Sequence, residues 1–361
     1  MAKFYYGGQA VIEGVMMRGQ RHMAVAVRAP DGSITLHEEA LNAALYRHPL
    51  MKLPVLRGLV ALWDALGLGM RALMFSADVA LQEGTPAEDV EQSALGAAAT
   101  TALPVAPALD AGYALPASIA PAVGGGDEPG SHANPAPQKA FSGPAAWTSI
   151  TLALGLMVSI FFVLPVLAAG LFGGLTNIKS SLANNIVEGV IRLALFLGYI
   201  WAIGRMRDIE RVFGYHGAEH KTINAYEAGV ELTPENVQRF TLLNPRCGTT
   251  FLLIVMLLAT VVFVLIGKLP FLLTVLSRIV LVPLIAAIAY EFIRAMANLY
   301  HYRVVRAILA PGIALQKMTT RPPDLSMIEV GIAALKVVLV ADGLLLPSQV
   351  EEATEPETAL A

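Results

Sequence analysis

Residues 147–171 read WTSITLALGLMVSIFFVLPVLAAGL and contain no charged side chain. The uncharged stretch is longer still, because it extends from Ala140 to Ile178. A helix that crosses a bilayer needs about 20 mainly apolar residues. We therefore predict a transmembrane helix here, and a membrane protein is the hypothesis from which the rest of the chain is interpreted.

The composition of the whole chain agrees with this hypothesis. Of its 361 residues 55% are apolar and only 15% are charged, and the mean hydropathy is +0.60. Soluble domains carry about 25% charged residues, which argues against a soluble enzyme or a disordered protein. The 25 basic residues against 28 acidic ones give no basic excess for binding nucleic acid. The single cysteine, Cys247, excludes an internal disulfide and therefore a secreted disulfide scaffold. From the apolar composition, the partner that we expect is a lipid bilayer.

Three further segments, 185–204, 248–267 and 269–290, are predicted to span the membrane. The first two of the four spans lie within 147–204 and the other two within 248–292. Arg278 interrupts the fourth span, and a charge inside a span is costly unless it faces a partner in the bundle. We expect Arg278 to pair with Glu188 of the second span and to lock the two helices together. A contact to a lipid or substrate headgroup is the alternative role of this arginine.

Basic residues near the ends of the spans predict their orientation, because they are enriched on the cytoplasmic side. The segment between the second and third spans and the one after the fourth are rich in them: Arg205, Arg207, Arg211, Lys221, Arg239, Arg246, Arg294, Arg303, Arg306 and Lys317. The two connections on the other side carry one each, Lys179 and Lys268. The N-terminus also lacks a cleavable signal pattern. We therefore predict a bacterial inner-membrane protein with both termini and residues 205–247 in the cytoplasm.

The N-terminal 50 residues predict a small cytoplasmic β-unit. Residues 22–29 and 33–38 alternate between apolar and polar side chains around the turn sequence Pro30-Asp31-Gly32, which is the pattern of a β-hairpin. The glycines at 7, 8, 14 and 19 are interpreted as backbone bends at strand ends. They lack the lysine and the strand–loop–helix context of a phosphate-binding loop.

The remaining segments predict helices and linkers around the spans. Residues 51–82 form an apolar helix on which Arg57, Asp64 and Arg71 share one stripe. We place this helix in the membrane interface, with packing against the bundle as the alternative. Residues 83–146, rich in Ala, Pro and Gly, are expected to be a disordered linker, and 346–361 a disordered acidic tail. Residues 293–345 form a cytoplasmic helical region, in which the apolar pattern of 327–340 predicts a helix that docks on the cytoplasmic part.

The chemically informative segment is GYHGAEHKTINAYE, residues 214–227, in a polar region that we expect to be exposed. His216, Glu219 and His220 form the pattern H-x-x-E-H. Residues four apart lie on the same side of a helix, so the two imidazoles can bind one metal ion, and Glu219 can accept a proton from a metal-bound water. The pattern is the inverted form of the H-E-x-x-H motif of zinc hydrolases.

A catalytic zinc site needs a third protein ligand and one open position. We rank Cys247 first, at the cytoplasmic end of the third span, and Glu291 second, just after the fourth. Glu227 is third, because eleven helical residues place it roughly 16 Å from His216 along the axis. The alternative interpretation is that both histidines are ordinary surface residues.

Four motifs in this order resemble the YqhQ-like family of bacterial multi-pass membrane proteins. These motifs are QAVIEGVMMRG at 9–19, GYHGAEHKTINAYE at 214–227, PRCGTTF at 245–251 and QKMTTRPPD at 316–324. The family has no known function and is often described as predicted metal-dependent enzymes. The resemblance implies a membrane location and a metal site on His216, Glu219 and His220. The family commonly has a histidine where this chain has Asn244, which removes one candidate ligand.

Together these inferences predict a mainly α-helical, polytopic membrane bundle of about four transmembrane helices, with a small N-terminal β-hairpin unit and an interfacial helix. The predicted function is that of a metal-dependent hydrolase of unknown substrate, with zinc as the first choice of divalent metal and Glu219 as general base. The alternative is a non-catalytic membrane scaffold that recruits a cytoplasmic protein partner through the hairpin unit and residues 205–247.

Overall fold

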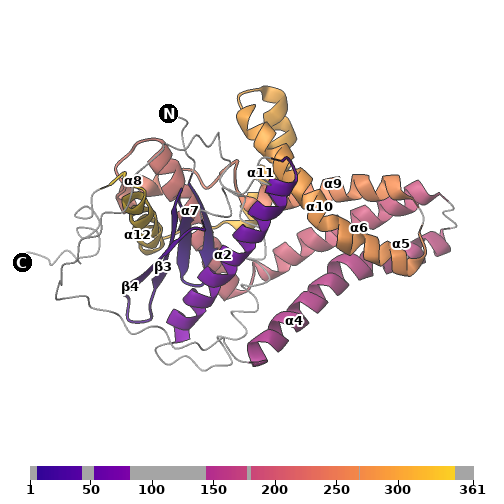
Figure 1. Cartoon of the computed structure of the whole chain (residues 1–361), viewed down its shortest axis with the longest axis horizontal. Coiled ribbons are helices and arrows are strands. Elements are labelled where there is room, and N and C mark those ends of the chain that lie inside the picture. The colour runs from indigo at the N-terminus through magenta and orange to yellow at the C-terminus, as the bar shows by residue number, and fades with distance from the viewer. Residues whose placement is uncertain (1–5, 43–52, 82–143, 177–179, 268, 346–361) are drawn as a thin grey trace, which may run out of the picture.

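The computed structural model describes residues 6–42, 53–81, 144–176, 180–267 and 269–345. The predicted acidic tail and the predicted linker, except its last three residues, lie outside the described residues. The described part is mainly helical and contains one small sheet. Figure 1 shows the sheet and its covering helices at one end of the molecule and long apolar helices extending from the other end.

The sheet is a four-stranded antiparallel meander in the order β1-β2-β3-β4. Its strands are β1 (Gly7–Val11), β2 (Gly14–Arg18), β3 (His22–Arg28) and β4 (Ile34–Ala40). The predicted hairpin is confirmed as β3 and β4, in which Val25 is paired with His37. The two strands before it were not predicted. All five residues of β2 are buried, and a strand covered on both faces shows no alternation of apolar and polar residues.

Each face of the sheet is covered by helices from distant parts of the sequence. Helix α2 (Leu56–Leu81) packs on the face formed by Met16 and Val25. Helices α7 (Arg207–Glu227) and α12 (Leu325–Ala341) pack on the opposite face, formed by Met17 and Ala24. The predicted helix at 327–340 therefore docks on the sheet, where the Asp324 side chain caps its first turn.

The charged stripe of α2 faces the protein. Arg57 pairs with Glu291, Asp64 with Arg18, and Arg71 with Glu39. The opposite side of the helix is apolar and exposed, and carries Leu56, Leu59, Trp63, Leu66 and Met70. Helix α2 runs obliquely to the long helices of the bundle (Figure 1). Its charges thus hold it to the sheet and to α10, while its outer face presents an apolar stripe.

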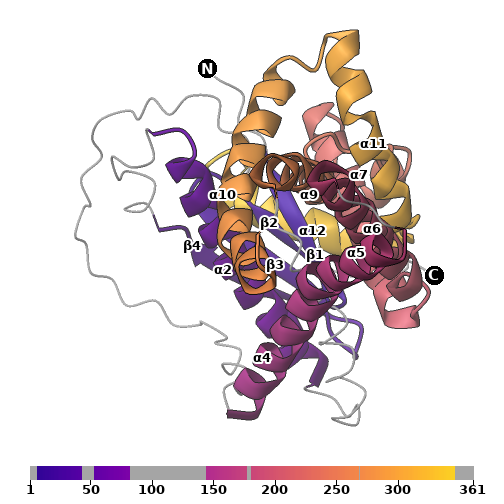
Figure 2. The same ribbon diagram turned by 90° about the vertical axis from the view of Figure 1, so that its right-hand side faces the viewer.

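The bundle contains a long, interrupted first helix and three further long helices, which pack in the order α5, α6, α9, α10 (Figure 2). Their bounds are α4 (Pro144–Val158), η2 (Ser159–Val163), α5 (Leu164–Leu175), α6 (Ser181–Ile203), α9 (Gly248–Ile266) and α10 (Phe271–Asn298). The short α8 (Pro234–Gln238) lies before α9, and α11 (Arg303–Thr319) follows α10. Five described helices are long and apolar enough to cross a membrane: the four predicted ones and α2.

The predicted pair between the second and fourth spans is present. Both carboxylate oxygens of Glu188 accept hydrogen bonds from Arg278, at 2.9 Å each. Arg192, one turn after Glu188, donates to the same carboxylate and to the Phe161 carbonyl. Both guanidinium groups also lie over the Phe263 ring, within 5.2 Å of its centre. One acidic and two basic side chains therefore form a buried ion cluster that joins α6 and α10.

Candidate metal centre

The H-x-x-E-H motif lies on α7, one of the two helices that cover the Met17/Ala24 face of the sheet. Asp208 and Glu210 in the first turn favour this helix through its dipole. Contrary to the expectation of an exposed segment, α7 is largely buried, because β1, α8 and α12 cover it. Close packing is visible at Gly217, where a β-carbon would lie 2.2 Å from the Arg321 carbonyl oxygen. Two of these elements, β1 and α12, lie far from α7 in the sequence, so the local sequence of α7 gives no sign of its burial.

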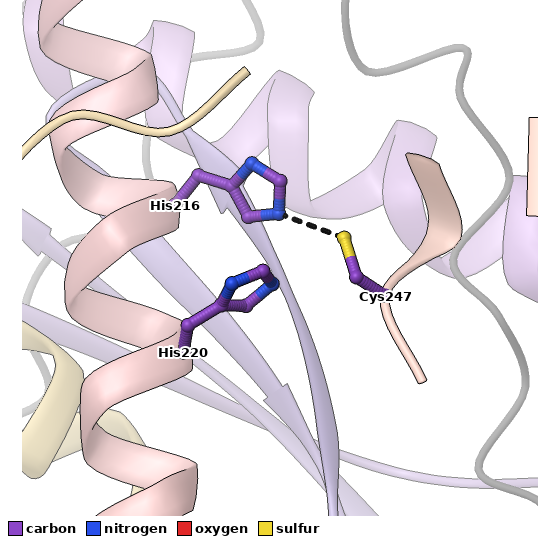
Figure 3. A group of neighbouring side chains, drawn as sticks. All are labelled: His216, His220 and Cys247. Atoms are coloured by element: carbon purple, nitrogen blue, oxygen red, sulfur yellow. Dashed lines mark hydrogen bonds between the residues drawn. The ribbon is translucent and has the colours of Figure 1, made fainter. Parts of the chain in front are cut away.

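His216 and His220 project from one side of α7 toward Cys247 (Figure 3). One ligand atom from each of the three residues lies within 4.8 Å of the other two. His216 Nε2 is 3.2 Å from Cys247 Sγ, and the two rings are 4.4 Å apart, centre to centre. His220 and Cys247 are buried and His216 is half-buried. The i, i+4 spacing and the cysteine at the start of α9 thus bring three soft or borderline ligand atoms together.

Both histidines are oriented by backbone carbonyls on the side away from the cluster. His216 Nδ1 donates to the Thr319 carbonyl at 2.8 Å, and His220 Nδ1 donates to the Leu242 carbonyl. These bonds place the ring proton on Nδ1 and leave Nε2 free as a ligand atom. A carbonyl partner on the second ring nitrogen is the usual arrangement of metal-binding histidines.

The histidine cluster contains an unsatisfied buried atom. Nε2 of His220 has no hydrogen-bond partner within the described part of the chain. A buried polar atom without a partner is costly, and nearly all such atoms in folded proteins are satisfied. A cation coordinated by this nitrogen would remove the cost, so the geometry and donor set fit a metal ion.

Cys247 is the N-cap residue of α9. Its Sγ also lies 3.3 Å from the Thr249 hydroxyl. The start of α9 and the Thr249 contact thus fix the sulfur of Cys247 beside the two histidines.

Glu219 lies on a different side of α7 and faces strand β1. Burial raises the pKa of Glu219 to about 7, and the His216 ring and a hydrogen bond from the Gly8 backbone oppose that rise only in part. A β-carbon at Gly8 would lie 2.8 Å from Glu219 Cγ, so β1 approaches this closely only because residue 8 is glycine. Glu219 is outside the three-ligand cluster but is poised to exchange a proton near neutral pH.

The structure does not bring the other two candidate ligands to the cluster. Glu227 pairs with Arg246, and Glu291 pairs with Arg57 of α2. Asn244 accepts a hydrogen bond from the Arg246 backbone through its side chain. Its backbone is held by Gln316 on both sides, at 2.9 and 2.6 Å. Asn244 thus shapes the turn that delivers Cys247.

Three features of the centre were missed from the sequence: the carbonyls of Leu242 and Thr319 and the close approach at Gly8. A carbonyl group belongs to every residue, so no residue type marks it in advance. Gly8 was interpreted as a bend, although it lies within β1. The one signal in the sequence was that Gly8 directly precedes the motif at 9–19, which is one of the four motifs of the family resemblance.

Comparison with known proteins gives a family but no function. A family model described as "Protein of unknown function (DUF1385)" matches residues 53–341. The chain is 29% identical over 349 residues to "Uncharacterized protein YqhQ" of Bacillus subtilis (strain 168), covering 94% of this chain and 93% of that protein. No solved structure matches the chain.

Proposed function

The chain belongs to the DUF1385 family of proteins of unknown function, and we propose that it is a membrane-embedded, metal-dependent hydrolase. The observation that carries the proposal is the free Nε2 of His220 beside His216 and Cys247. If a zinc ion were bound by His216, His220 and Cys247, these three protein ligands would leave one position for substrate or water, as in catalytic rather than structural zinc sites.

The donor set favours zinc. Two imidazoles and one thiolate match its preference for nitrogen and sulfur ligands in tetrahedral geometry. A bound zinc ion acts as a Lewis acid and makes water a nucleophile at neutral pH. We propose zinc as the resident ion on this basis, ahead of other divalent metals.

Glu219 is the proposed general base. A carboxylate is an efficient base when its pKa lies near the working pH, and burial raises the pKa of Glu219 to about 7. The Gly8 backbone donates a hydrogen bond to the carboxylate, which fixes its position against β1. The absence of a side chain at Gly8 therefore lets β1 come close enough to position the Glu219 carboxylate.

The proposed location is the bacterial inner membrane, with both termini and the metal centre on the cytoplasmic side. Five helices of sufficient length and apolarity support membrane insertion, and the positive-inside rule supports this orientation. Cys247 starts α9 and Gly204 ends α6, so the centre would lie close to the headgroups of the inner leaflet.

The test is metal analysis of protein purified in detergent, by inductively coupled plasma mass spectrometry. We expect about one zinc ion per chain in the wild type, as the one three-ligand cluster of the described residues implies. The double variant His216→Ala, His220→Ala should hold almost none. His301→Ala is the matched control, since His301 is exposed and far along the chain from the cluster. Equal, near-zero metal in all three proteins would end the proposal.

Glu219→Gln separates the enzyme from the scaffold alternative. The variant keeps the three ligands and nearly the same shape, so it should retain metal while losing function in vivo. A scaffold that recruits partners through the hairpin unit would keep its function in this variant and lose it when the hairpin is deleted. Full complementation by Glu219→Gln would therefore favour the scaffold.

A further inference from the structure

The two segments that orient the histidines also line a pocket of about 420 Å³. One wall is formed by residues 241–243 and the other by residues of the 317–322 stretch. The Leu242 carbonyl in the first wall holds His220, and the Thr319 carbonyl in the second stretch holds His216. The pocket therefore adjoins the candidate metal centre.

The side chains of the pocket carry uncompensated positive charge. Lys317 and Arg321 line it, and no acidic residue does. The guanidinium of Arg321 donates to the backbone carbonyls of Met318, Thr320 and Gly204. Neither cation pairs with a carboxylate anywhere in the described ranges of the chain. The lining of the pocket thus includes two cationic residues and no acidic one.

We propose that this pocket binds a phosphate group and that the substrate is a phosphate-bearing molecule; the second half rests on the proposed function. The planar guanidinium of Arg321 and the ammonium of Lys317 match phosphate oxygens, which accept charge-assisted hydrogen bonds. Two uncompensated cations suit a dianion better than a single carboxylate. The volume lies within the range of small-molecule sites.

The pocket is accessible to two sources of phosphate. Arg321 contacts the Gly204 carbonyl at the end of α6, a helix long and apolar enough to span a membrane. In the proposed orientation a lipid headgroup and a soluble phosphate ester would both reach this level. They present the same group to Lys317 and Arg321, so the chemistry of recognition is shared.

The experiment is a calorimetric titration of inorganic phosphate into detergent-purified, full-length protein stripped of metal with EDTA. Phosphate should bind the wild type, and Lys317→Glu should weaken binding about 10-fold or more, because it removes a charge-assisted bond and adds repulsion. Arg306→Glu is the matched control: it reverses an exposed charge on the same helix outside the pocket and should change affinity less than about 2-fold after screening by salt. Lys317→Met is the second variant, for use if the charge reversal impairs folding, and it should also weaken phosphate binding.

Absence of phosphate binding, or equal affinity in wild type and Lys317 variants, overturns the proposal. Because the protein is stripped, the result does not depend on the metal centre. If the stripped protein binds phosphate but the protein as purified contains no zinc, only the proposed function is overturned. If the purified protein contains zinc but the stripped protein does not bind phosphate, only this inference is overturned.

Competition identifies the source of the phosphate. Glycerol 3-phosphate and dihexanoyl phosphatidic acid are each used to displace inorganic phosphate. Tighter competition by the first supports a soluble ester, and tighter competition by the second supports a lipid headgroup. Failure of both to compete would show that the pocket takes no phosphate ester and would overturn the substrate class.

Discussion

Two clusters of buried polar side chains differ in how their atoms are satisfied. In the bundle, Glu188 accepts hydrogen bonds from Arg192 and Arg278, so donors and acceptor complete one another. At the junction with the sheet, the ligand atoms of His216, His220 and Cys247 converge on each other. One of these atoms, His220 Nε2, has no partner among the described residues. The first cluster is complete in itself, whereas the second has a ligand atom that a bound cation would satisfy.

The difference shows why burial of charge or polarity does not by itself indicate a functional site. A buried ion cluster whose members satisfy each other needs no ligand, and its role is to hold helices in register. A cluster of acceptors that point at one position is stable only with a cation or proton among them. The sequence marks both clusters as unusual, but only the contacts separate them.

The largest effect should come from breaking the ion cluster of the bundle. Glu188→Gln removes the one negative charge that two buried arginines share, and we expect a loss of about 3–5 kcal/mol in the free energy of unfolding. Arg278→Met is the comparison variant, because it leaves Glu188 paired with Arg192 and should cost less. Thermal and denaturant unfolding in detergent micelles measure both. Equal losses of unfolding free energy in the two variants would contradict the view that both arginines depend on the Glu188 carboxylate.

The next effect is a pH dependence of the metal-free protein. The pKa of Glu219 is about 7 in the folded state against 4.5 for a free glutamate, so the folded state holds its proton more tightly than the unfolded state. Glu219 therefore contributes stability that is fully present below pH 4.5 and is lost as the pH rises through about 7. At about 1.4 kcal/mol per pKa unit the change is about 3 kcal/mol.

Glu219→Gln should remove this component, so the difference in unfolding free energy between wild type and variant should vary with pH across that window. Chemical unfolding at several pH values measures it. Parallel pH profiles of the two proteins would contradict a buried, proton-retaining Glu219.

A smaller effect tests which residue is the third ligand of the histidine cluster. Zinc at 100 times its dissociation constant should stabilise the wild type by about 2.7 kcal/mol. Cys247→Ser should lose most of this stabilisation, because a hydroxyl is a much poorer zinc ligand than a thiolate. Glu291→Gln should retain it, since Glu291 pairs with Arg57 away from the cluster. A zinc response lost in the glutamate variant and kept in the cysteine variant would reverse the assignment.

The smallest effect is expected at an ion pair on the surface, outside both clusters. Arg71 of α2 pairs with Glu39 of β4, but the Arg71 side chain is 53% exposed. Water screens such a pair, so Arg71→Ala should cost only about 0.2–1 kcal/mol. The same unfolding assay measures this change, and a loss as large as that of Glu188→Gln would mean that burial does not explain the comparison.

The spacing of the motif allowed two of the three clustered residues to be chosen from sequence, because residues four apart share a helix face. Cys247 was chosen by ligand chemistry and by its place at the end of a predicted span. The burial of α7 could not be predicted, since it depends on β1 and α12, which lie far from α7 in the sequence on either side. Strands β1 and β2 were missed for a related reason: residues buried on both faces of a sheet lose the period that identifies a strand.

The helix that closes the sheet is the last described element of the chain. Asp342, just after α12, accepts hydrogen bonds from the Tyr6 hydroxyl and from the backbone amides of Gln20 and Arg21, so the beginning and the end of the described chain are joined directly. Every long apolar helix is synthesised between these two points. During translation, the sheet face that α7 and α12 cover together stays incompletely covered until α12 has been made. A chain truncated before α12 would therefore leave part of that apolar face open to chaperones and proteases.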